Sequence, residues 1–266
     1  MKTRHLLSAK AVCGIMMFLC AAAGAADPDP GLLGWWPFDE GADVYSANAV
    51  DPAGEAELIN VSWVKGPFGT ALRFGGTDCH VILPHIAKLD GADQMTVAVW
   101  AYWEGTGQYP NILTGGTWSP GGFLFFVRDK AVSFRMGRPG HRHGAAAEAW
   151  SETSALFLSE LPMKQWVHLT AVFKRPEITT YVNGKKVGSA KWDYPVGHSG
   201  DIQLGRWGGE TCHKGLIDDV RIYGRALTAD EVAALANPAG REGAEYQDLG
   251  PAAPDAKELV SLETRH

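Results

Sequence analysis

The chain has 266 residues, a formal net charge of −6 and 45% hydrophobic residues. This composition is that of a globular protein rather than a disordered or fibrous one, and the length allows one large all-β or α/β domain or two small ones. The acidic balance argues against a nucleic-acid partner, which needs a basic protein face for its phosphates, and against electrostatic docking on anionic membranes.

The N-terminus has the three parts of a secretory signal peptide. Lys2, Arg4 and Lys10 give a positive start, an apolar run follows over residues 11–23, and small residues come next. The run is short for a membrane span, and an uncleaved anchor is the alternative. We expect residues 1–26 to be removed, which leaves a secreted, periplasmic or cell-surface protein without membrane insertion.

Two of the four cysteines, Cys13 and Cys20, leave with that signal peptide. Cys79 and Cys212 remain, and an even pair in an oxidising compartment is expected to form one disulfide. The chain-entropy model gives about 4–5 kcal/mol for closing so long a loop. Two free buried thiols are the alternative.

Short apolar segments recur along the chain between Gly, Pro, Asn and Asp residues, and they predict strands. In chain order these are residues 32–38, 71–74, 80–83, 95–103, 111–114, 123–128, 131–136, 155–158, 165–174, 179–182, 185–189, 201–204 and 216–223. No long helix separates them, which excludes βαβ units. The pattern predicts an all-β fold, a two-sheet antiparallel sandwich of the jelly-roll type.

A tight turn and a helix are predicted in the C-terminal half. Asn183-Gly184 supplies the two positive-φ residues of a two-residue hairpin turn. Thr228 to Glu231 is a capping box that predicts one short helix, and Pro238 ends it. We therefore expect one domain over residues 27–238, followed by a polar, disordered tail over residues 239–266.

Several segments follow one another in a fixed order. They are Trp-Trp-Pro-Phe-Asp-Glu-Gly at 35–41, Phe-Gly-Thr-Ala-Leu-Arg-Phe at 68–74, Trp-Val-His-Leu-Thr-Ala-Val at 166–172, Tyr-Val-Asn-Gly at 181–184 and Gly-Leu-Ile-Asp-Asp-Val-Arg-Ile-Tyr at 215–223. This series resembles the laminin-G-like, concanavalin A-like jelly-roll family. The resemblance covers residues 32–236 and implies a fold more firmly than an activity. Domains of this family mostly bind glycans, matrix proteins or neighbouring domains.

The same resemblance implies a structural calcium ion. Asp218 is predicted to share an otherwise aliphatic strand face with Ile222. A buried carboxylate needs an ion or hydrogen bonds, and Asp39, Asp218 and Asp219 are the candidate Ca²⁺ ligands. The alternative is an ion pair of Asp218 or Asp219 with Arg221, or backbone hydrogen bonds.

Aromatic residues in predicted loops and at strand ends are candidates for stacking on sugar rings. The candidate ligand-binding residues are Trp118, Trp150, Trp192, Trp207, Tyr109 and Arg206. The alternative is that the tryptophans fill the ends of the sandwich, because large aromatic side chains are usually mostly buried.

Catalytic signatures are missing from the sequence. Neither the E-x-D-x-x-E spacing of jelly-roll glucanases nor a G-x-S-x-G elbow occurs. We therefore expect a secreted, non-catalytic module that binds a carbohydrate or a cell-surface or matrix glycoprotein. A protein–protein adhesion or structural envelope module is the alternative, and a polysaccharide lyase or glycoside hydrolase is the third possibility.

Overall fold

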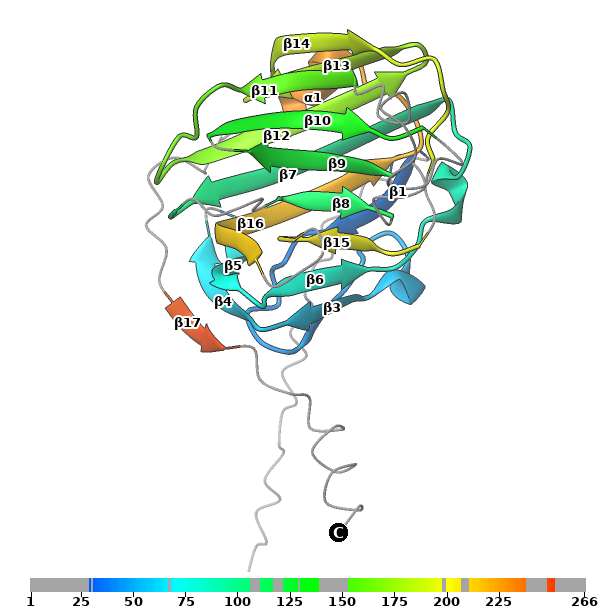
Figure 1. Cartoon of the computed structure of the whole chain (residues 1–266). Coiled ribbons are helices and arrows are strands. Elements are labelled where there is room, and N and C mark those ends of the chain that lie inside the picture. The colour runs from blue at the N-terminus through cyan, green and yellow to red at the C-terminus, as the bar shows by residue number, and fades with distance from the viewer. Residues whose placement is uncertain are drawn as a thin grey trace, which may run out of the picture.

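The computed structural model describes Asp29 and residues 31–66, 68–105, 111–116, 122–128, 130–138, 153–197, 200–206, 211–237 and 248–251. Two antiparallel sheets stack face to face (Figure 1). The front sheet contains, in spatial order, β11 (Thr153–Leu158), β10 (Ala131–Met136), β9 (Phe123–Arg128), β8 (Leu113–Gly115), β15 (Ile202–Leu204), β6 (His80–Leu83), β3 (Ala56–Ile59) and β2 (Tyr45–Ser46).

The back sheet contains β14 (Lys185–Lys191), β13 (Glu177–Val182), β12 (Trp166–Lys174), β7 (Gln94–Trp103), β16 (Thr211–Tyr223), β5 (Gly69–Thr77), β4 (Val61–Gly66) and β17 (Asp248–Pro251). The opening strand β1 (Leu32–Trp36) pairs with the C-terminal end of β16. This arrangement confirms the predicted two-sheet antiparallel jelly roll.

Each of the thirteen predicted segments corresponds to a strand, whereas β2, β3, β4 and β17 were not predicted. Between β3 and β4 only Asn60 intervenes, in the left-handed region with φ 51°. That single residue turns the chain from the front sheet to the back sheet. The sequence pattern does not reveal this change of sheet, because apolar residues continue on both sides of Asn60.

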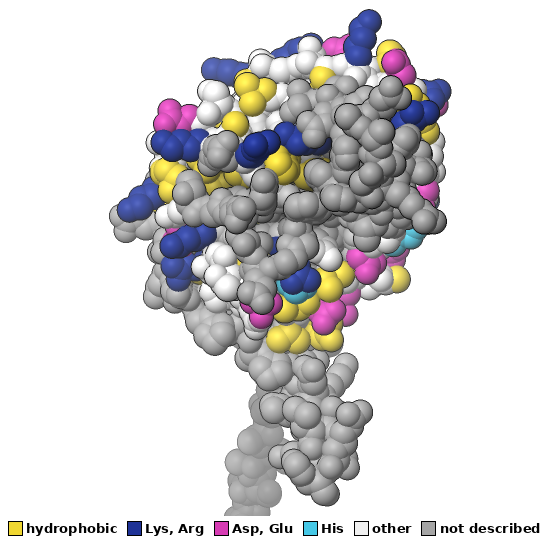
Figure 2. Space-filling model, in the orientation of Figure 1, with side chains coloured by type: hydrophobic (Ala, Val, Ile, Leu, Met, Phe, Trp, Pro, Cys, Tyr) yellow, Lys and Arg dark blue, Asp and Glu magenta, His cyan; other side chains and the backbone are white. Residues whose placement is uncertain are grey.

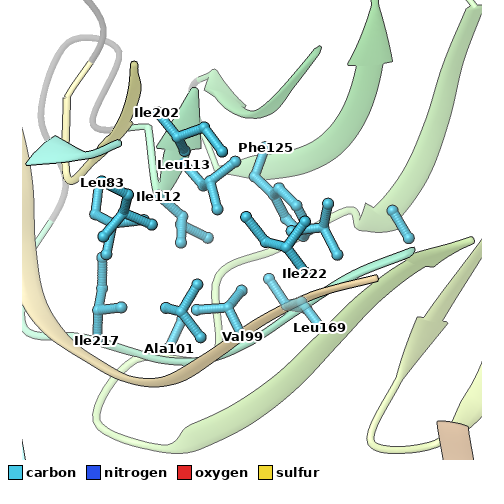
Figure 3. Close-up of a cluster of buried hydrophobic side chains, with 14 of the residues drawn as sticks. Leu83, Val99, Ala101, Ile112, Leu113, Phe125, Leu169, Ile202, Ile217 and Ile222 are labelled. Carbon is cyan, nitrogen blue, oxygen red and sulfur yellow. The ribbon is translucent and has the colours of Figure 1, made fainter. Parts of the chain in front are cut away.

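The core lies between the two sheets (Figure 3). Leu113, Phe125 and Ile202 reach in from the front sheet, and Val99 and Leu169 meet them from the back sheet. All of these side chains are buried. Alternation along each strand sends the next residue to the outer face. The core therefore decides which residues the outer faces present.

The short helix α1 (Ala229–Leu235) packs on the outer face of the back sheet, where its Val232 meets Val172 and Tyr181. Its capping box is present as predicted: the Thr228 side chain accepts from the Glu231 backbone N–H, and the Glu231 carboxylate accepts from the Thr228 backbone N–H. No helix in the described part of the chain has the length and apolar character to cross a bilayer.

The C-terminal segment differs from the expected tail at one place. Residues 248–251 form β17, which pairs with β4 through Asp248 opposite Val64 and Pro251 opposite Ser62. A short strand of this kind depends on the neighbouring strand for its hydrogen bonds, so its own polar sequence carries little signal.

Candidate functional site

A row of side chains crosses the outer face of the front sheet. Arg135 on β10 lies opposite Leu124 on β9, and Leu124 lies opposite Thr114 on β8. Thr114 in turn lies opposite Gln203 on β15, and Gln203 lies opposite Ile82 on β6. Neighbouring strands are about 4.8 Å apart, so the row advances by roughly the length of one sugar unit per strand.

The two residues in the middle of the row are buried, and the residues on either side of them are partly exposed. Leu124 and Thr114 are 5% and 4% exposed, although they point away from the core. Arg135, Gln203 and Ile82 are partly exposed. The Arg135 guanidinium lies 3.8 Å from the ring centroid of Phe126, which is a cation–π contact.

A glycine turn places Arg206 next to this row. Gly205 follows β15 at φ 83°, and a Cβ atom there would overlap the ring of Phe74. Only glycine fits both requirements. The Thr114 hydroxyl donates to the carbonyl of Arg206 at 3.2 Å, which ties the turn to β8.

The predicted disulfide is confirmed, and it lies directly beneath Arg206. Cys79 and Cys212 are bonded with their Cα atoms 5.9 Å apart, and both are buried. Cys212 forms a backbone bridge with Arg206, and Cys79 is followed by His80 on β6. The covalent link therefore holds Arg206 and His80 in one region, although they are far apart in sequence.

Arg206 and His80 influence one another electrostatically. The Nε–H of Arg206 donates to Gln203 Oε1 at 3.3 Å. Burial and, second, the positive charge of Arg206 lower the pKa of His80 to about 4, and Asp78 opposes this shift weakly. His80 is therefore neutral at pH 7, and it can exchange hydrogen bonds without carrying charge.

The charge of this face differs from that of the chain as a whole. The strands β11, β10, β9, β8 and β15 contain no Asp or Glu, and Arg128 and Arg135 are their charged residues. Figure 2 looks onto this face and shows a His side chain beside a Lys or Arg side chain, over the part of the sheet where β6 and β15 lie. These five strands therefore carry cationic and no acidic side chains, whereas the neighbouring strand β3 of the same sheet contributes Glu57.

Trp192, expected as a stacking residue, lies instead in the core with 3% exposure. Its ring meets Tyr194 at 5.2 Å, so it fills one end of the sandwich, the alternative left open above. A large ring in the core removes more apolar area from water than the same ring at the tip of a loop, which favours the buried position for Trp192. The other aromatic candidates, Tyr109, Trp118, Trp150 and Trp207, lie outside the described residues.

The Gly137 N–H donates to the Gly122 carbonyl at 2.8 Å, so the start of β9 and the end of β10 lie together at one end of the front sheet.

The carboxylates proposed as calcium ligands have other contacts. Asp39 accepts from the Thr70 backbone N–H at 3.2 Å. Asp219 accepts from Arg221 Nε at 2.9 Å and from Trp35 Nε1 at 2.7 Å, so the ion pair left open above is present. The described residues contain no group of three or more His, Cys, Asp or Glu side chains that could hold a metal ion. Calcium binding stays a prediction.

A bulge in β16 corrects the expected orientation of Asp218. The pairing with β7 shifts between Asp218 and Arg221, and Asp219 takes φ 47°. Val220 and Ile222 point into the core, whereas Asp218 lies on the other face of the sheet, opposite Trp100, where it is still 0% exposed. Strict alternation along a regular strand would place Asp218 and Ile222 on one face of the sheet. The extra residue of the bulge moves the residues after it to the opposite faces.

Sequence reasoning missed His80, Gln203 and Arg135. The signal for His80 was its place directly after Cys79, at the start of a strand in which Val81 and Leu83 point inward. Gln203 stands between two core residues in the same way. Their proximity to Arg206 depends on strand pairing, which the sequence does not show.

Comparison with known proteins places this geometry in context. A family model described as the concanavalin A-like lectin/glucanases superfamily matches residues 74–233. No curated protein matches the chain.

Among solved structures, domain 4 of an extracellular arabinanase from Geobacillus stearothermophilus, in complex with arabinotriose, is similar with a TM-score of 0.56 and 21% identity, over 77% of this chain and 98% of that one. The binding domain of Paraclostridial Mosquitocidal Protein 1 has a TM-score of 0.62 at 16% identity, over 78% and 52%. A structure of botulinum neurotoxin type C, a toxin whose cell entry is described as dependent on interaction with two ganglioside molecules, has a TM-score of 0.57 at 15% identity. The match covers 78% of this chain and 51% of that one. The chain thus spans about half the length of the two toxin structures.

Proposed function

The chain belongs to the concanavalin A-like lectin/glucanases superfamily, and on that premise we propose that it is a secreted, non-catalytic module that binds carbohydrate on the outer face of the front sheet. The observation that carries the proposal is the row from Arg135 to Gln203 with Arg206 beside it. The partly exposed cationic and amide groups of Arg135, Gln203 and Arg206 suit the hydroxyl groups of a sugar chain.

Two further observations support this function. The similar arabinanase domain was solved with arabinotriose, and the similar neurotoxin is described with gangliosides. A glycosidase needs two carboxylates across the scissile bond, and the front-sheet strands β11, β10, β9, β8 and β15 supply none.

A glycan array with the purified protein tests the proposal. We expect binding to a defined glycan class, and we expect Arg206→Gln to weaken it. Arg73→Gln is the matched control, because Arg73 is a partly exposed arginine on the back sheet, paired with Glu104. No binding at millimolar glycan would contradict the proposal and favour the adhesion module instead. Release of reducing ends or unsaturated uronates from a bound polysaccharide would contradict the non-catalytic role.

A further inference from the structure

Arg206 and His80 have hydrogen-bonding groups that the described part of the chain does not use. A guanidinium has five N–H donors and stays charged. Only Nε–H of Arg206 has an acceptor there, Gln203, and Arg206 forms no ion pair with any described residue. His80 is 5% exposed, and its Nδ1 is buried without a hydrogen-bond partner among the described residues. Buried polar groups are normally satisfied, and the described residues supply no acceptor for the remaining N–H groups of Arg206 and no partner for His80 Nδ1.

The charges around the pair favour an anionic partner. Carboxylates on this side of the described structure include Glu57 on β3, opposite Ile82, Asp78 in the turn before β6, and Asp201 before β15. Of the two charges that act on His80, the positive charge of Arg206 has the larger effect on its pKa.

We propose that the ligand of this site is an acidic polysaccharide, one carboxylate of which is held by Arg206 and His80 against β6 and β15. The inference rests on the proposed function and names its ligand class. The planar fork of arginine matches a carboxylate in bidentate fashion, whereas a neutral hydroxyl uses one donor at a time. Gln203 and the rest of the row toward Arg135 then contact the neighbouring sugar units. At the other end of the row, the negative charge of Glu57 repels further acidic units.

Matched ligands provide the test. Oligouronates from polygalacturonate and from alginate are titrated calorimetrically alongside their carboxyl-reduced products, which keep the same linkages without the charge. Acetate alone and a sulfated oligosaccharide show whether a carboxylate suffices and whether another anion replaces it. We expect at least one oligouronate to bind about tenfold more tightly than its reduced counterpart, with a salt-dependent affinity.

Three variants identify the residues. We expect Arg206→Gln to weaken oligouronate binding by about tenfold or more, and Arg206→Lys to restore it only in part because the fork is lost. Arg73→Gln, the control on the other sheet, should leave it unchanged. Glu57→Gln should strengthen it, since an opposing charge at the margin is removed.

His80 gives a readout that a merely structural role would not move. A bound carboxylate neutralises Arg206, so the pKa of His80 should rise from about 4 when an oligouronate is added, and the reduced ligand should not raise it. The pKa of His213, also about 4, provides the internal control, because His213 is fully buried between Phe74 and Trp103. NMR titration of the two imidazoles measures both values.

The outcomes separate the two proposals. Equal affinity for an oligouronate and its reduced counterpart, or binding of the reduced form alone, would overturn the acidic ligand and leave carbohydrate binding intact. Preference for the sulfated ligand over every uronate would overturn the carboxylate. If neither these ligands nor any glycan on the array binds, the proposed function itself fails.

Discussion

Asp219 holds the opening strand to β16 from a strained backbone position. Its φ of 47° is unfavourable for most residues, and its carboxylate accepts from Trp35 and Arg221. The Arg221 guanidinium also lies 4.5 Å from the centroid of the Trp35 ring. The hydrogen bond and the cation–π contact join β1 to β16, and the ion pair holds Asp219 and Arg221 in place beside Trp35.

Two substitutions at this position separate charge from conformation. Asparagine tolerates the left-handed region, so Asp219→Asn should lower the free energy of unfolding by about 1–3 kcal/mol through the lost ion pair. Asp219→Ala should cost roughly 1 kcal/mol more, since alanine disfavours that region. Urea denaturation measures both, and equal values for the two variants would contradict the conformational part.

We expect the folded protein to lose stability in mild acid because of His213. Burial lowers its pKa from 6.5 to about 4 in the folded protein. Between these two pH values the unfolded chain binds more protons than the folded one, so stability falls as the pH is lowered through this window. Each such histidine contributes up to about 1.4 kcal/mol per pH unit.

His213→Gln should reduce that pH dependence, and His80 should retain its own share. Melting temperatures of the protein and the variant between pH 7 and pH 4 provide the measurement. Parallel curves over the whole range would show that His213 does not titrate as expected.

At the scale of elements, β11 of the front sheet lies close to β13 and β14 of the back sheet at one edge of the sandwich, where a glycine leaves room for the contact. The Thr180 hydroxyl of β13 donates to the Leu156 carbonyl of β11 at 2.7 Å. Gly188 of β14 allows this approach, because a Cβ atom there would lie 2.5 Å from the same carbonyl oxygen. Glycine at this position therefore lets a front-sheet strand close against the back sheet.

Gly188→Ala should lower the free energy of unfolding by about 1–3 kcal/mol, the usual cost of overpacking. Gly75→Ala in β5 is the matched control, since a Cβ atom there meets nothing within 4 Å. Chemical denaturation of both variants tests the contact. Similar stabilities would show that β11 can move away from β14 without loss.

For the whole molecule, the disulfide joins cysteines 133 residues apart and thus constrains most of the sandwich. The chain-entropy model gives about 5 kcal/mol for a loop of this size. It also anchors the site, because Cys212 bridges Arg206 and Cys79 precedes His80.

Replacing both cysteines, Cys79→Ser with Cys212→Ser, should lower the free energy of unfolding by about 2–5 kcal/mol and weaken ligand binding as the two side chains separate. Denaturation and calorimetric titration measure the two effects. A destabilised variant that binds as tightly as the parent protein would show that strand pairing alone positions the site.

The sequence by itself determined the fold class, the strands with regular alternation, the hairpin turn, the capped helix and the disulfide. Each of these follows from local periodicity, turn chemistry or a count of residues. Arg206 was named from the sequence as a candidate ligand-binding residue, and that role stays a prediction.

Tertiary structure alone decided the composition of the site. His80 and Arg206 lie in one region because β6 and β15 pair and a disulfide joins residues next to them. The outward turn of Asp218 depends on a bulge, and the burial of Trp192 depends on space at the end of the sandwich. Such features arise from contacts between distant segments, which local patterns do not contain.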